Sequence, residues 1–222
     1  MAPQRTLRLA HRGDWRAGPE NSLDAMAAAL AVRACDGLEF DVRASSDHIP
    51  VLNHDATLAR VHGRPERVEE LTAVALGMLG IPTLREVLAA VGRRAFLDVE
   101  LKGDPGGAVI EVLAAGRGPA LENAVISSFE RAALDRVARL APSWPRWLNA
   151  PWLSPAAIRT ATELGCRAVA LDWRAIDEST MDTARAAGLE VAAYTVRRRS
   201  TYDRLVRLGV IAICAEAAAL DG

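Results

Sequence analysis

The chain has 222 residues, of which half are hydrophobic, and it carries 28 acidic and 27 basic side chains. A chain of this length can bury one large hydrophobic core but hardly two, so we expect one domain spanning residues 1–222. Because the net charge is close to zero, the composition favours a small-molecule partner and gives no indication of binding to nucleic acid or to a charged membrane surface.

Short apolar runs alternate with longer alanine- and leucine-rich stretches of helical period, which is the pattern of a parallel β/α protein. Eight such runs predict strands. Eight β/α units in this length favour an α/β fold of the (β/α)8 TIM barrel type over an open doubly wound sheet, which more often has five or six strands. In chain order the predicted strands cover residues 7–11, 38–42, 95–101, 124–128, 146–150, 168–172, 190–195 and 210–214.

Residues that favour helix starts stand between the predicted strands. Typical N-cap residues stand at three of these places, namely Asn21 with Ser22, Thr83, and Ser154. Residues 44–80 interrupt the alternation, because they carry several charges and show no clean helical period. We interpret this segment as an insertion or lid between the second and third β/α units.

Acidic residues stand near the ends of two predicted strands. Glu39 and Asp41 are two residues apart on the second strand, and Asp98 and Glu100 are two apart on the third. Side chains alternate along a strand, so each pair projects to one face. Two carboxylates about 4 Å apart repel by about 4 kcal/mol at an effective dielectric near 20. A divalent cation would remove this repulsion, and all-oxygen ligands favour Mg²⁺ or Ca²⁺ over zinc.

Several short motifs follow one another in the first half of the chain. They read H-R-G at 11–13, P-E-N-S at 19–22, G-L-E-F-D-V at 37–42, N-H-D at 53–55, I-P-T-L at 81–84 and E-L-K at 100–102. In this order they resemble the motifs of the glycerophosphodiester phosphodiesterase family. The resemblance covers residues 8–102 and extends through S-S-F-E at 127–130 and Y-T-V at 194–196.

The resemblance implies a phosphoric diester hydrolase that converts a glycerophosphodiester to an alcohol and glycerol phosphate. It implies that Glu39, Asp41 and Glu100 hold the metal and that His11 and His54 form the general acid–base pair. Histidine suits proton transfer at neutral pH, because its unperturbed pKa is about 6.5. In the family-like mechanism a substrate hydroxyl attacks phosphorus, the alcohol departs, and water opens the resulting cyclic phosphate. We assign His11 as the base and His54 as the acid.

Three more residues complete the predicted site. Arg12 and Lys102 could stabilise the negative charge that builds on the phosphate oxygens. Lys102 is the only lysine of the chain, which favours a specific need for a compact ammonium group at this position. Glu20 could serve only the dipole of the helix that follows, but the resemblance assigns it to the substrate-binding site. Asp98 lies one pleat deeper than Glu100, and we expect it to be structural.

The last third of the chain departs from the family pattern. Where the family usually has Trp-Thr-Val-Asn, this chain has Y-T-V-R at 194–197, and where the family usually ends on Thr-Asp-x-Pro it has C-A-E-A at 214–217. We expect these differences to affect recognition of the alcohol group and to leave the phosphorus chemistry unchanged. We interpret the three arginines at 197–199 as a solvated face.

The spacing of the cysteines and the lengths of the apolar runs indicate in which cellular compartment the protein would be found. Cys35, Cys166 and Cys214 lie far apart and lack the C-x-x-C spacing of a zinc or redox site, which favours a reducing compartment. The sequence has no signal-like N-terminal run and no stretch of eighteen apolar residues. We therefore expect a cytoplasmic protein without stable membrane association. The sequence does not indicate the oligomeric state.

Three alternative functions remain open at this point. A phosphodiesterase of the same superfamily could act on lysophospholipids. A different metal-dependent barrel enzyme, such as an isomerase or aldolase, could use three carboxylates and a lysine for enolate chemistry. A binding protein could have kept the barrel and lost activity, although retention of both histidines and all three carboxylates argues against this.

Overall fold

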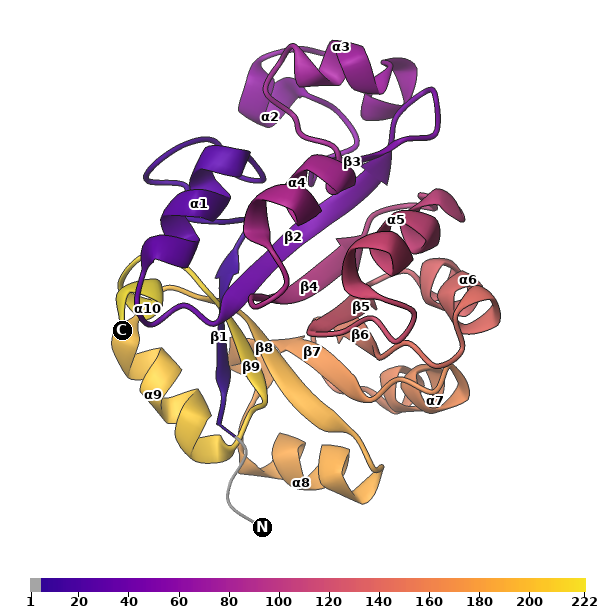
Figure 1. Ribbon diagram of the computed structural model, residues 1–222. Helices are drawn as coiled ribbons and strands as arrows, with labels where there is room; N and C mark the ends of the chain where they lie inside the picture. Colours follow the sequence, from indigo (N-terminus) through magenta and orange to yellow (C-terminus); the bar gives the residue numbers. More distant parts are fainter. Residues whose placement is uncertain (1–4) are drawn as a thin grey trace.

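The computed structural model describes residues 5–222. Its sheet has nine strands, and eight of them are parallel and close into a barrel, because β1 pairs with both β2 and β9 (Figure 1). The structure is therefore the predicted (β/α)8 TIM barrel. The strands are β1 (Leu7–His11), β2 (Gly37–Ala44), β3 (Pro50–Leu52), β4 (Phe96–Leu101), β5 (Ala124–Ser128), β6 (Arg146–Ala150), β7 (Ala168–Asp172), β8 (Glu190–Val196) and β9 (Ala212–Ala215).

Helices surround the barrel and connect its successive strands (Figure 1). They are α1 (Leu23–Ala31), α2 (Ala59–His62), α3 (Ala73–Gly77), α4 (Leu84–Val91), α5 (Ala108–Arg117), α6 (Arg131–Leu140), α7 (Pro155–Glu163), α8 (Glu178–Ala186), α9 (Arg199–Leu208) and α10 (Ala218–Asp221), with short 3₁₀ turns η1 (Val68–Glu70) and η2 (Trp173–Ala175). Within residues 5–222, no helix has the length and apolar character needed to cross a bilayer.

The predicted helix starts are occupied by N-caps. The side chains of Ser22, Thr83 and Ser154 each accept a hydrogen bond from the backbone N–H three residues further on. These bonds satisfy donors that have no partner inside the helix. Since Ser22 caps α1, the neighbouring Asn21 is free to serve the functional site.

Apolar side chains close the end of the barrel at which the strands begin. The rings of Phe96 and Trp147 stack there with 6.1 Å between their centroids, and both pack with Leu9 and with small alanines of β7, β8 and β9. A second and larger apolar layer lies between the strands and the surrounding helices. Polar side chains inside the barrel are thereby concentrated at the end where the strands finish.

The segment after β2 extends beyond the barrel and carries β3, α2 and α3 (top of Figure 1). β3 runs antiparallel to β2, so the chain turns back towards the mouth of the barrel. The segment has an apolar cluster of its own, formed by Val51, Leu58, Val68, Leu76 and Ile81. This small core holds the loop that follows β3, which contains His54, beside the barrel strands.

Gly37 begins β2 at a close approach to β4, because a Cβ at this position would lie 2.0 Å from the carbonyl oxygen of Phe96. We expect Gly37→Ala to force the two strands apart and to lower the free energy of unfolding by about 1–3 kcal/mol. Gly77→Ala, where nothing lies within 4 Å, is the control and should be neutral or slightly stabilising. Equal denaturation midpoints for the two variants would contradict this expectation.

Candidate active site

A cavity of about 230 Å³ opens at the end of the barrel where the strands finish. Six of the predicted site residues line it, namely His11, Arg12, Glu39, His54, Glu100 and Lys102. Asp41 lies directly behind this lining and is fully buried. Glu20 also lies outside the lining. The structure thus brings together residues from β1, β2, β4 and the loop after β3.

The carboxylates of Glu39, Asp41 and Glu100 form one buried group. One oxygen atom of each lies within 4.8 Å of the others. Among the described residues, neither carboxylate oxygen of Glu39 has a hydrogen-bond partner. Buried acidic oxygens without partners carry a large desolvation cost, which a bound cation would offset. The donor set consists of oxygen atoms alone and therefore fits a hard divalent cation.

The three carboxyl groups differ in their pKa values. Burial raises the pKa of Glu39 well above its usual range, and the charges of Asp41 and Glu100 add to the effect. The pKa of Glu100 is raised for the same reasons, burial first and then Asp41. Burial also acts upward on Asp41, but Arg12 and Lys102 outweigh it and lower the pKa of this carboxyl. Asp41 is therefore the carboxyl of the three whose ionised form the neighbouring charges favour most.

Arg12 and Asn21 hold Asp41 from the loop between β1 and α1. Arg12 Nε lies 3.0 Å from Asp41 Oδ2. Asn21 Nδ2 donates to the same oxygen at 3.0 Å, and the Asn21 side-chain oxygen accepts from the Asp41 backbone N–H at 3.2 Å. Arg12 and Asn21 both have left-handed backbones, with φ of 58° and 60°. Asn21, at the start of α1, is thus a support of the carboxylate group.

Lys102 lies between two of the carboxylates. Its ammonium group forms an ion pair with Glu100 and lies 3.2 Å from Asp41 Oδ1. Burial acts to lower the pKa of Lys102, but Asp41 and Glu100 raise it above its usual value. The lone lysine of the chain therefore stands charged at the edge of the cavity, where a phosphate oxygen could approach it.

Glu20 supports Arg12 and does not line the cavity. Its carboxylate pairs with Arg12 at 3.0 Å and with Arg60 of α2 at 2.6 Å. Arg60 also donates to Asp55 Oδ2 at 2.6 Å. These ion pairs connect the loop after β1 with the insertion, and Arg60 had no signal in the sequence.

His54 is fixed through both its ring and its backbone. Its Nδ1 lies 2.7 Å from Asp55 Oδ1, and its carbonyl oxygen accepts two hydrogen bonds from Arg43, at 3.0 and 2.8 Å. Burial lowers the pKa of His54, against the opposing effect of Asp41. Arg43 is on β2, so the barrel itself sets the position of this histidine.

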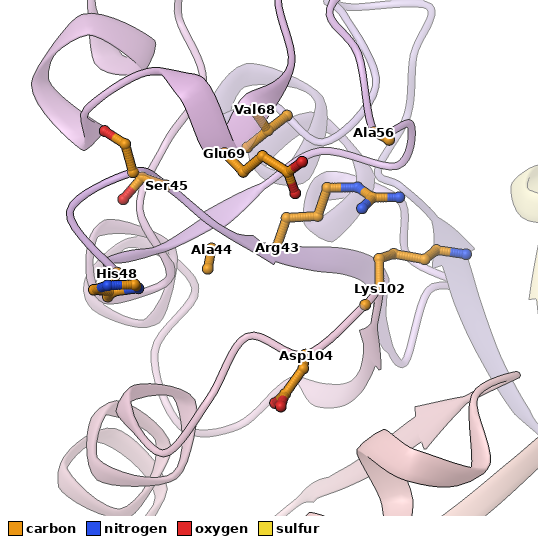
Figure 2. A pocket seen from close by; sticks show the side chains of 11 residues that line it. Arg43, Ala44, Ser45, His48, Ala56, Val68, Glu69, Lys102 and Asp104 are labelled. Atoms are coloured by element: carbon orange, nitrogen blue, oxygen red, sulfur yellow. The ribbon is translucent and has the colours of Figure 1, made fainter.

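A second cavity, of about 180 Å³, lies between the insertion and the loop after β4. Figure 2 shows the side chains of Arg43 and Lys102 extending in the same direction along it, with the carboxylate of Glu69 beside Arg43 and with Asp104 pointing away. Lys102 lines both cavities. The two cavities are therefore neighbours on either side of this lysine.

His11, at the end of β1, is held by Glu216, which directly follows the neighbouring strand β9. Its Nδ1 lies 2.6 Å from Glu216 Oε1, and Arg197 donates to the other oxygen of Glu216 at 2.6 Å. His11 Nε2 lies 3.7 Å from Glu39 Oε2 and 3.5 Å from Thr195 Oγ1. Arg197 was predicted to lie on a solvated face, and most of its side chain is exposed although it reaches Glu216. Glu216 was not among the predicted site residues. An acidic residue directly after a barrel strand was the available signal.

Neutral side chains form the remaining wall of the cavity. Tyr194 donates its hydroxyl to the Ala150 carbonyl at 2.9 Å, and the ring of Phe129 meets it edge-on with 5.6 Å between centroids. Asn149 lies nearby and has a buried side-chain oxygen without a partner among the described residues. Asp98 also lines the cavity but is not one of the three clustered carboxylates, and burial raises its pKa to about 7. The side chains of Phe129, Asn149 and Tyr194 therefore offer uncharged contacts beside the carboxylates and the cationic side chains of the same cavity.

Comparison with known proteins gives consistent matches along the chain. The model of the glycerophosphoryl diester phosphodiesterase family matches residues 11–219. A glycerophosphodiester phosphodiesterase of Caldanaerobacter subterraneus is 27% identical, over 93% of this chain and 92% of that protein. Another, from Bacillus subtilis, is 25% identical over 96% and 84%. A solved Oleispira antarctica phosphodiesterase in complex with the product sn-glycerol-3-phosphate has a TM-score of 0.84 and 26% identity, covering 95% of this chain and 93% of its own.

The raised pKa of Glu39 predicts a pH-dependent effect of Glu39→Gln in chelator. Well below pH 4.5, the usual pKa of a glutamate, the side chain is protonated in both the folded and unfolded states, so the variant should match wild type. As the pH rises, ionisation favours the unfolded state of wild type, and the glutamine variant escapes this loss. By pH 8 we expect Glu39→Gln to be more stable by about 1–3 kcal/mol, measured by thermal unfolding. Glu122→Gln, on an exposed ion pair, is the control and should change little. A stability advantage of Glu39→Gln that does not grow with pH would contradict this explanation.

Proposed function

Because this chain belongs to the glycerophosphoryl diester phosphodiesterase family, we propose that it hydrolyses a glycerophosphodiester to an alcohol and glycerol phosphate. The observation that carries the proposal is the meeting of two histidines, three carboxylates and two cationic side chains at one cavity in the barrel mouth. The Oleispira relative has sn-glycerol-3-phosphate as its product, which supports glycerol phosphate as a product here.

We propose Glu39, Asp41 and Glu100 as the ligands of a divalent cation, Mg²⁺ or Ca²⁺. Their support is the partnerless oxygens of Glu39 and the close approach of the three carboxylates. A cation bound there would offset the negative charge of the phosphodiester and of its transition state. Asn21 and Arg12 would keep Asp41 in place.

Arg12 and Lys102 are the proposed phosphate-binding residues. Both line the cavity, and both are largely buried, which strengthens their interaction with a bound anion. Glu20 contributes through its ion pair with Arg12, which orients the guanidinium group. Phe129, Asn149 and Tyr194 provide the uncharged side of the cavity, where the glycerol or alcohol part of the substrate would lie.

His11 and His54 are the proposed general base and general acid. His11 Nε2 faces the Glu39 carboxylate, so a substrate hydroxyl at this point could give its proton to His11 while its oxygen attacks phosphorus. His54 also lines the cavity, from the loop after β3, and would protonate the departing alcohol. The negative charge of a bound phosphodiester would favour the protonated form of His54 that this step needs.

The nature of the alcohol separates the remaining candidates. A panel of glycerophosphodiesters and a lysophospholipid, assayed for free alcohol and glycerol phosphate, distinguishes a water-soluble substrate from a lipid one. Turnover of a sugar phosphate without turnover of any diester would instead select an isomerase or aldolase. The family membership of the chain favours the diesterase.

Divalent cation should raise the melting temperature of the wild-type protein. A ligand that binds only the folded state at a hundredfold excess over its Kd adds about 2.7 kcal/mol, which corresponds to several degrees for a domain of this size. Glu100→Gln should lose most of this shift, whereas Glu122→Gln should keep it. If neither Mg²⁺ nor Ca²⁺ shifts the melting temperature at tens of millimolar, and chelator leaves the activity intact, the metal site is wrong.

Replacing either histidine should abolish most of the activity without unfolding the protein. We expect His11→Ala and His54→Ala each to lower kcat about 100-fold or more, because each removes a proton-transfer group. His48→Ala is the matched control, since His48 is exposed on the insertion, and it should retain activity. Steady-state kinetics with circular dichroism would decide, and a folded His54→Ala protein with normal kcat would refute the assignment.

A further inference from the structure

Glu216 follows β9 and is buried, with 5% of its surface exposed. One of its carboxylate oxygens lies 2.6 Å from His11 Nδ1, and the other accepts a hydrogen bond from Arg197 Nε at 2.6 Å. Arg197 stands where the family pattern has an asparagine, and Glu216 lies within the C-A-E-A segment that stands where the family usually has Thr-Asp-x-Pro. The two atypical segments are therefore in direct contact, and through Glu216 they reach a proposed catalytic histidine.

The state of the His11 ring follows from this contact. His11 and Arg197 lower the pKa of Glu216 to about 2, against the effect of burial, so this carboxylate is ionised. An ionised carboxylate only accepts hydrogen bonds, and His11 Nδ1 must therefore carry the proton. In the neutral ring this leaves Nε2, which faces Glu39 and the cavity, as the unprotonated nitrogen. A general base at Nε2 requires this tautomer.

The main chain holds Glu216 independently of its side chain. Its backbone N–H donates to the Val196 carbonyl at 2.8 Å, and its own carbonyl accepts from Ala219 at 3.1 Å. The side chain thus projects from a fixed position at the junction of β8 and β9. Arg197 follows β8 directly, and most of its side chain is exposed, so it can reach Glu216 only from the solvent side.

We infer that Glu216 and Arg197 form a positioning pair for His11, in which Glu216 fixes the orientation and tautomer of the imidazole and Arg197 fixes the Glu216 carboxylate. Neither residue belongs to the group of carboxylates that would hold a cation, and neither has to touch the substrate for this role. The inference rests on the proposed function of His11. It adds to that function two residues that specify how the base is held.

The experiment measures kcat and KM for Glu216→Gln, Arg197→Gln, Arg197→Lys and the double glutamine variant. Glu216→Gln should lower kcat at least about tenfold and leave KM within about twofold, because it loses charge at His11 but no substrate contact. Arg197→Gln should lower kcat by a smaller factor, and Arg197→Lys should restore most of it. In the Glu216→Gln background, Arg197→Gln should cause no further loss, since the two residues act in series.

The matched control is the ion pair of Arg167 with Glu190, which lies at the opposite end of the barrel, where β8 begins. Glu190→Gln removes the same charge from the same strand neighbourhood and should leave kcat unchanged. The concentration of divalent cation that gives half of the melting-temperature shift should be the same in Glu216→Gln as in wild type. A change in that concentration would show that Glu216 acts on the cation site, and would overturn the inference.

A spectroscopic readout separates failure of this inference from failure of the proposed function. Nitrogen-15 spectra of the imidazoles should show His11 with its proton on Nδ1 in wild type, and this signature should be lost in Glu216→Gln and kept in Glu190→Gln. A wild-type diesterase whose Glu216→Gln variant has normal kcat would overturn the inference and leave the function standing. If wild type cleaves no diester, the function fails, and the tautomer of His11 still decides the positioning role: a proton on Nε2 in wild type overturns it.

Discussion

The concentration of negative charge in the barrel mouth is the constraint on which the rest of the site depends. Glu39, Asp41 and Glu100 are buried within a few ångströms of one another, and an uncompensated group of this kind would destabilise the folded chain. The protein compensates it only in part. Arg12 and Lys102 lie against Asp41, while both oxygens of Glu39 have no partner among residues 5–222. The negative charge that these two residues do not compensate lies on carboxylate oxygens, which are the ligands that a hard cation requires.

Each histidine of the cavity contacts a carboxylate, and that carboxylate in turn contacts an arginine. His54 contacts Asp55, which contacts Arg60, and His11 contacts Glu216, which contacts Arg197. In both cases a carboxylate meets Nδ1 and leaves Nε2 for the cavity. The two assemblies come from different parts of the fold, the first from the insertion and the second from the closing strands. The insertion therefore helps to build the proposed active site and is more than a cover for the barrel.

Much of the fold and about half of the site could be predicted from local pattern. The period of two along β2 and β4 placed Glu39 with Asp41, and Asp98 with Glu100, each pair on one face, and the observed cavity contains or adjoins all four. Asn21 and Ser22 were both candidates for the start of α1, and Ser22 is the N-cap. Glu20 was expected to belong to the substrate-binding site; it pairs with Arg12 and Arg60, and its contact with substrate stays a prediction. Propensity identifies which residues can cap a helix and cannot tell which of two neighbours does.

The sequence by itself determined the eight apolar runs, their alternation with helices, and the placement of acidic residues two positions apart on two strands. These features depend only on residues within a few positions of each other. Only the tertiary structure decided that Glu216 meets His11, 205 positions away. The closing of β1 onto β9 brings them together. Sequence spacing carries no information about distance across a barrel seam, since that distance is set by the pairing of the first and last strands and not by the length of chain between them.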